Sequence, residues 1–130
     1  MCSARRSAAA ATELRPGLYC VDASMLQGLA PRLKGPWSTD YDQAYQRLRA
    51  RGLLLRSAAA ALRFARLCAY LRRTPPLASA GATIFVWRLS AADLHEALLG
   101  APAELVPSAL LSPALREHQR RMLRELAKVL

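Results

Sequence analysis

Residues 41–73 constrain the fold more than any other stretch, because they combine a helical spacing of apolar residues with a run of arginines. Between Gln43 and Ser90 there are nine arginines and no aspartate or glutamate. The whole chain has 19 basic and 9 acidic residues and a net charge of +10, so outside this window the two signs nearly balance. The net charge is therefore a property of one region. Its arginines are Arg47, Arg49, Arg51, Arg56, Arg63, Arg66, Arg72, Arg73 and Arg88.

The spacing of apolar and small residues predicts that most of this stretch is helical. Ser38 or Thr39 is a candidate N-cap, and Pro75 stops the helix at the far end. Gly52 divides the prediction into helices over 40–51 and 53–73, because glycine costs about 1 kcal/mol in a helix interior. We expect the arginines on exposed faces, away from one apolar seam. That seam repeats every three or four residues through Leu53, Ser57, Ala60, Phe64, Leu67 and Leu71.

The C-terminal residues predict a second long helix. Ser112 is its N-cap and Pro113 takes the first helical position, where the missing N–H does no harm. Its seam repeats at the same spacing, so we expect the two longest helices to pack against each other. The residues of this seam are Leu115, Gln119, Met122, Leu126 and Val129.

The remaining segments predict short elements. Residues 18–21 and 82–89 are strand candidates, although 82–89 could instead begin a helix. We expect short helices over 25–33, capped by Asp22 or Ser24, and over 91–99, which Ser90 and Asp93 begin as a capping box. The fold class is thus mainly α, a small helical bundle with one or two short strands. We expect a flexible or targeting-like tail over 1–16 and a single helical domain over 17–130.

Cysteine usage and the N-terminal composition bear on the compartment. Cys2, Cys20 and Cys68 are widely spaced, odd in number and form no zinc or CxxC pattern. They predict reduced thiols in a reducing, intracellular compartment. Residues 1–12 contain arginine, serine and alanine without an acid, which is typical of a mitochondrial transit segment; the alternative is a frayed tail. No run is long and apolar enough to predict a transmembrane helix.

Candidate catalytic and metal-binding residues do not cluster along the chain. His95 and His118 are isolated on predicted helices, and a metal site needs several such ligands together. Neither a glycine-rich phosphate loop nor a GxSxG elbow is present. We therefore expect no metal, no cofactor and no enzymatic activity.

Residues 18–26, Leu-Tyr-Cys-Val-Asp-Ala-Ser-Met-Leu, resemble the opening strand of PIN-type nucleases, a hydrophobic run followed by Asp, a small residue and Ser or Thr. The resemblance implies a parallel sheet and several carboxylates that hold Mg²⁺ or Mn²⁺. Asp22 would be the first carboxylate and Asp93 a later one. The family's second acid belongs in the middle of the chain, where this sequence has arginines. Without the resemblance, Asp22 is a helix cap.

The acid-free run of arginines is the feature with functional content. Arginine forms bidentate contacts with phosphates and carboxylates. The alternative is a solvated helix face in a chain that uses arginine in place of lysine, since Lys34 and Lys128 are its lysines. A solvated face ordinarily mixes both charges, so the run favours partner binding. The candidate contact residues are Arg47, Arg49, Arg51, Arg56, Arg63, Arg66, Arg72 and Arg73.

Three hypotheses about function follow, in order of preference. The first is a non-catalytic, basic helical protein, an accessory subunit that docks on RNA or on acidic protein surfaces of a larger complex. The second is a free-standing, dimeric regulator that binds nucleic acid. The third is a metal-dependent nuclease. We therefore expect the partner to be an acidic protein or a nucleic acid. The chain itself would be a subunit of a hetero-complex or a homodimer.

Overall fold

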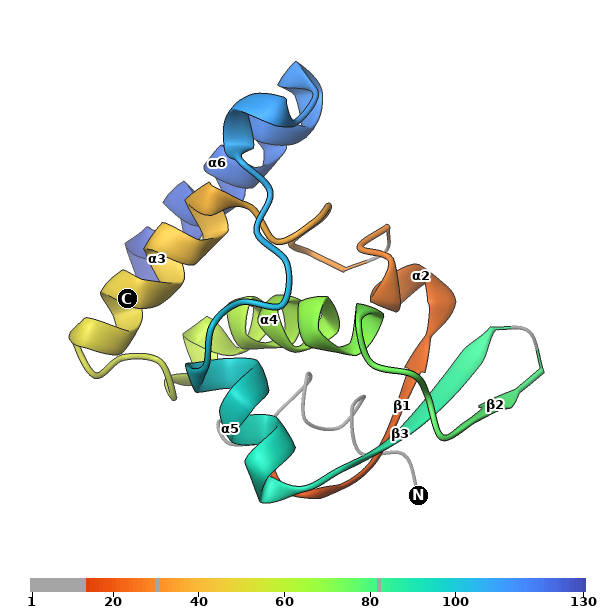
Figure 1. The fold of residues 1–130 in the computed structure, drawn as a ribbon. Helices are drawn as coiled ribbons and strands as arrows, with labels where there is room; N and C mark the ends of the chain where they lie inside the picture. Colours follow the sequence, from red (N-terminus) through yellow and green to blue (C-terminus); the bar gives the residue numbers. More distant parts are fainter. Residues whose placement is uncertain (1–13, 30, 82) are drawn as a thin grey trace.

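The structure is a computed structural model that describes residues 14–29, 31–81 and 83–130. These residues are mainly helical, as predicted, but they also form a small sheet, so the fold is not a purely helical bundle (Figure 1). In chain order the elements are β1 (Gly17–Asp22), α2 (Ala23–Leu26), α3 (Thr39–Ala50), the 3₁₀ turn η1 (Ser57–Ala59), α4 (Ala60–Arg72), β2 (Ala78–Ala80), β3 (Ile84–Leu89), α5 (Ala91–Leu99), the 3₁₀ turn η2 (Ser108–Leu110) and α6 (Pro113–Val129).

The sheet has β3 in its middle, antiparallel to β1 on one side and to β2 on the other. Tyr19 of β1 lies opposite Trp87 of β3. The β-branched and aromatic residues of β3 favour an extended chain, so the strand prediction over 18–21 is confirmed, and the one over 82–89 is confirmed from Ile84 onward. β2 lies outside both predicted strands. Its residues are Ala-Ser-Ala, which have little strand propensity, so this strand depends on pairing with β3.

α4 is the central helix, and it is buried on more than one side (Figure 1). Phe64, Leu67 and Leu71 pack with β1, β3 and α5 in one core cluster. Leu62 and Ala69 belong to a second cluster, which α3 shares. The prediction of a single apolar seam therefore accounts for only part of the buried surface of this helix. The start of the predicted seam is also wrong, because α4 begins at residue 60 rather than 53 and Ser57 is exposed.

α3 and α6 lie side by side and run in the same direction (Figure 1). Arg120 of α6 pairs with Asp40 at the start of α3, with 3.0 Å between Nε and Oδ2. Further along, Leu126 packs against the core cluster that contains Leu48 of α3. The prediction that α6 packs on the later helix of the arginine stretch is therefore confirmed only at η1, and the main helical neighbour of α6 is α3. The sheet, α3 and α5 already surround α4.

The helix ends largely follow the predicted signals. Ser38 caps α3, Ser112 caps α6, and Ser90 begins α5 in a capping box with Asp93. α3 ends just before Gly52, whose φ of +69° suits glycine. α2 is shorter than the predicted helix over 25–33. It ends at Leu26, and Gly28 follows with a positive φ.

Several expectations concern the termini, the thiols and the membrane. Residues 1–13, which include most of the predicted tail and the transit-like segment, lie outside the described residues.

Cys68 is a free, buried thiol, but Cys20 is held in a disulfide. The expectation of reduced thiols is therefore wrong at Cys20, because an odd number of cysteines does not exclude one pair. Among the described residues, no helix combines the length and the apolar character needed to span a membrane.

Candidate functional site

Arg66, expected on an exposed face, is instead buried with 1% of its surface accessible. Its Nη1 lies 3.0 Å from Oδ1 of Asp42, and its other nitrogens donate to the backbone oxygens of α5 and the residue that follows it. The guanidinium carbon lies 5.5 Å from the ring centre of Trp37 and 5.1 Å from that of Tyr45. Rings and a carboxylate therefore replace the water that the charge has lost.

Arg63 is also inside the protein, with 2% of its surface accessible. Its Nη1 donates to the backbone oxygens of Leu54 and Arg56, so it ties the loop between α3 and α4 to the helix. Burial lowers the pKa of the Arg63 guanidinium. The expectation of exposed faces is therefore wrong for both Arg63 and Arg66, and neither can reach a partner.

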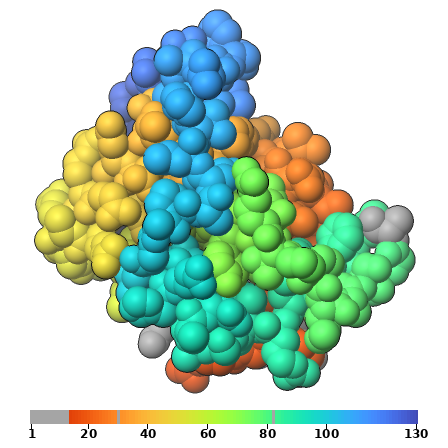
Figure 2. Space-filling model, viewed as in Figure 1, coloured from red at the N-terminus to blue at the C-terminus, as the bar shows by residue number. Residues whose placement is uncertain are grey.

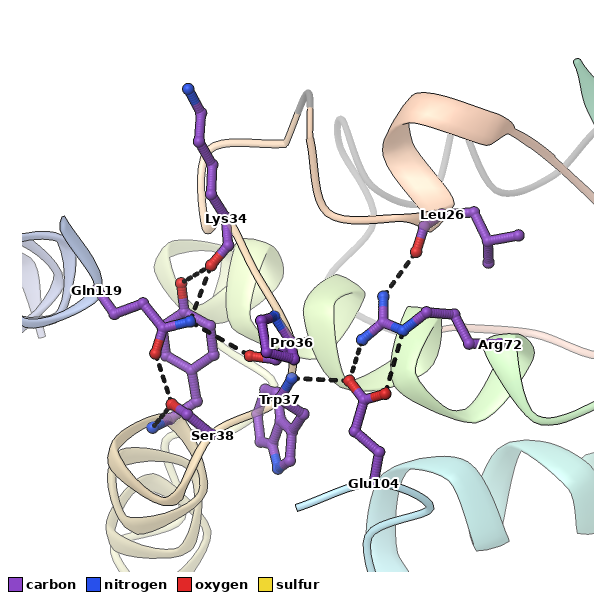
Figure 3. A network of polar contacts seen from close by, with 9 residues as sticks. Leu26, Lys34, Pro36, Trp37, Ser38, Arg72, Glu104 and Gln119 are labelled. Atoms are coloured by element: carbon purple, nitrogen blue, oxygen red, sulfur yellow. Dashed lines mark hydrogen bonds and ion pairs between the residues drawn. The ribbon is translucent and has the colours of Figure 1, made fainter. Parts of the chain in front are cut away.

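Arg72 is partly buried in the polar network of Figure 3. Its guanidinium pairs with Glu104, which lies in the loop between α5 and α6, and Nη1 donates to the backbone oxygen of Leu26 at 2.6 Å. Oε1 of Glu104 also accepts the backbone N–H of Trp37 at 2.8 Å. One ion pair thus joins α2, α4 and two loops, which makes Arg72 a structural residue.

Gln119 is the polar member of the α6 seam, and it is fully buried. Oε1 accepts the hydroxyl of Ser38 at 2.6 Å, and Nε2 donates to the backbone oxygens of Lys34 and Pro36 (Figure 3). A buried amide costs free energy unless such partners are present. Gln119 therefore fastens α6 to the loop that precedes α3.

The other candidate arginines are exposed, and most acidic residues of the described chain are engaged elsewhere. Five carboxylates of the described chain form ion pairs: Asp40, Asp42, Glu104, Glu117 and Glu125. Asp22 and Asp93 cap helices. Arg49 donates to the backbone oxygen of Leu99 at 3.1 Å. Within the described residues, no ion pair or hydrogen bond engages the side chains of Arg47, Arg51, Arg56 and Arg73.

Two of these arginines border a groove between α3 and α6, which we call the α3–α6 groove. It has a volume of about 180 Å³. Arg47 and Arg51 stand one helical turn apart on its α3 side. The rest of the lining is apolar: Ala44, Leu48, Leu123, Leu126, Ala127 and Leu130. The sequence prediction includes Leu126 but misses Leu123 and Leu130, although their 3 and 4 spacing from Leu126 was a usable signal.

The arrangement does not bring together the groups that the PIN-type resemblance implies. The sheet is antiparallel where a parallel sheet is implied. Oδ1 of Asp22 accepts the backbone N–H of Met25 at 2.9 Å, and the side chain of Asp93 accepts that of Ser90 at 2.8 Å. Among the described residues, no three His, Cys, Asp or Glu side chains are grouped as a metal site requires. Both aspartates therefore have a structural role at helix starts.

Burial raises the pKa of Cys68 in α4 and of Tyr45 in α3, and this predicts that the folded chain loses stability at high pH. Burial raises the pKa of Cys68 from 9.0 to about 12 and that of Tyr45 from 10.0 to about 12. Between these values the unfolded chain releases protons that the folded chain keeps, so stability is present below about pH 9 and falls as the pH rises.

Replacing Cys68 with alanine removes one of these protons. We expect the Cys68→Ala variant to lose stability less steeply between pH 9 and 11, by about 1.4 kcal/mol per pH unit. Urea unfolding of both proteins at pH 7, 9, 10 and 11 measures this slope. A constant difference between the two proteins across that range would contradict the prediction.

Comparison of the chain with protein-family models, with curated protein sequences and with solved structures gave no match. The arrangement of its own side chains must therefore carry the functional argument. Those side chains form an apolar groove with Arg47 and Arg51 on its edge, and neither arginine has an ion-pair partner among the described residues.

Proposed function

We propose that the chain is a non-catalytic, basic binding protein, an accessory subunit that docks on an acidic segment of a larger complex. One observation carries this proposal. Arg47 and Arg51 border the α3–α6 groove and have no carboxylate partner within the described residues. An exposed guanidinium gains most from a carboxylate that approaches with both oxygens.

The groove supports a helical partner. Arg47 and Arg51 stand four residues apart and so face the same side of α3. Leucine side chains from α3 and from the C-terminal part of the chain line the groove and form the apolar surface that an amphipathic helix requires. A partner helix would place apolar residues at i, i+3/i+4 and i+7 in the groove, and carboxylates beside the two arginines.

The same surface favours protein over nucleic acid. Bases bind best where aromatic side chains are open for stacking. Tyr41 and Tyr45, the aromatic residues of α3, are fully buried and pack on Trp37. The groove is lined by aliphatic side chains instead, and phosphates gain nothing from these.

The test uses the full chain and a fluorescein-labelled helical peptide of roughly 20 residues, with leucines along one face and glutamates beside them. Fluorescence anisotropy gives the Kd. We expect the Arg47→Gln/Arg51→Gln variant to bind about tenfold to a hundredfold more weakly, since each lost charged contact contributes about 0.7–1.4 kcal/mol. Its melting temperature should stay unchanged, because both side chains are exposed.

The matched control is Arg15→Gln/Arg88→Gln, which changes the net charge equally at exposed sites outside the groove. This control should bind the peptide like the unaltered chain. Equal losses in the two variants would mean that overall charge, and not the groove, attracts the peptide. An RNA duplex is the second ligand: tight, steeply salt-dependent binding of RNA with no binding of peptide would favour the nucleic-acid regulator instead.

A further inference from the structure

A second exposed surface lies at the other end of the molecule, where β2 and β3 form a hairpin. The hairpin projects beyond the body of the protein (Figures 1 and 2), far from α3 and α6. β2 pairs with β3 along one edge, and no described strand pairs with its other edge. Its three residues, Ala78, Ser79 and Ala80, are all exposed.

An unpaired strand edge presents backbone N–H and C=O groups to any extended chain that approaches. Proteins usually protect such edges with charged residues, proline, a bulge, a covering loop or a very short strand, and of these β2 has its short length of 3 residues. β2 has no charged side chain, and its residues are so small that another backbone could come close. Leu77, just before β2, adds an exposed apolar side chain with 63% of its surface accessible.

A hollow of about 320 Å³ lies between the base of this hairpin and the ends of α2 and α4. We call it the hairpin hollow. Phe85 and Trp87 of β3 line it on one side, and Pro75 and Pro76 on another. Arg72 and Arg73 also line it, but Arg72 is paired with Glu104, so Arg73 supplies the available charge. The hollow therefore suits a large apolar side chain with a carboxylate near it.

From this edge and this hollow we infer a second docking site, in which an extended, acidic segment of a partner protein adds a strand to β2. Backbone hydrogen bonds to β2 would supply part of the affinity, and an apolar side chain in the hollow would supply specificity. A carboxylate of the segment would pair with Arg73. A second copy of this chain is the less favourable occupant, because two chains of net charge +10 repel each other.

The probe for this site is a short acetylated peptide of alternating threonine and glutamate with one central phenylalanine. Amide hydrogen exchange of the full chain should slow at residues 78–80 when this peptide is added. A peptide of the same sequence with alternate backbone amides N-methylated should bind at least tenfold more weakly, because methylation removes the donors that a strand needs. Equal affinity of the two peptides, or unchanged exchange at 78–80, would overturn the inference.

Two variants separate this site from the proposed function. Arg73→Gln should weaken binding of the extended peptide about tenfold. Arg47→Gln/Arg51→Gln should leave that binding unchanged, because the α3–α6 groove lies elsewhere. If the groove variant lost the extended peptide and Arg73→Gln kept it, the hairpin site would be wrong even though the groove proposal stood. Concentration-dependent dimers of the free chain, broken by Leu77→Glu, would show that a second copy occupies the edge and overturn the acidic partner.

Discussion

Replacing Asp42 with alanine is expected to lower the free energy of unfolding by about 3–5 kcal/mol, because it leaves the buried charge of Arg66 without a counter-ion. Asp42 accepts the Nη1 of Arg66 at 3.0 Å and the indole N–H of Trp37 at 3.1 Å. Both donors share Oδ1 of this carboxylate, so its loss leaves both without their acceptor. Backbone oxygens and two rings still contact the guanidinium, but they cannot neutralise it. Chemical denaturation at pH 7 measures the change.

Two further variants make this prediction specific. Glu117→Ala breaks an ion pair with Arg124 in which both side chains are more than 60% exposed, so it should cost less than about 0.5 kcal/mol. Asp42→Ala/Arg66→Met removes both buried charges and should be more stable than Asp42→Ala, since an uncharged side chain needs no counter-ion. If Asp42→Ala behaved like Glu117→Ala, burial of Arg66 would not decide the stability of this region.

Replacing Trp37 with alanine should cost a similar amount, about 3–5 kcal/mol or more. The indole is 1% exposed and packs on Tyr41 and Tyr45, with ring centres 5.6 and 5.4 Å apart. It also lies against the guanidinium of Arg66, a contact that adds about 1–2 kcal/mol in a dry site. The alanine variant leaves a cavity beside a buried charge, and thermal unfolding by circular dichroism measures its cost.

The Trp37→Phe variant separates the contribution of the aromatic ring from that of the indole hydrogen bond to Asp42. Phenylalanine keeps an aromatic ring in the core but lacks the N–H that Asp42 accepts. We expect it to cost about 1–2 kcal/mol, clearly less than alanine. A loss as large as that of Trp37→Ala would mean that the hydrogen bond, rather than the volume of the ring, holds this loop in place.

Local signals in the sequence predicted many element boundaries. Ser90 and Asp93 begin α5, Ser112 and Pro113 begin α6, and Gly52 follows α3. Each signal acts within about one helical turn, so neighbouring residues suffice to interpret it. β2 escaped prediction because its pairing partner, and not its Ala-Ser-Ala sequence, makes it a strand.

The candidate site was predicted less well than the elements. Of the eight arginines named from sequence, Arg63 and Arg66 are buried and Arg72 is partly buried in an ion pair. Helical periodicity assumes that one side of a helix is buried, and α4 has core on two sides. The α3–α6 groove needs two helices side by side, and no local pattern specifies which pair that will be.

The amino-acid sequence by itself determined where the main helices begin, where the extended segments of β1 and β3 fall, and that the middle of the chain has cations without acids. The tertiary structure alone decided which of these cations lie inside. The acids that pair with Arg66 and Arg72 lie 24 and 32 residues away along the chain. A charge leaves water only where the folded chain brings a counter-charge and hydrogen-bond acceptors to it, and neighbours in sequence do not reveal that place.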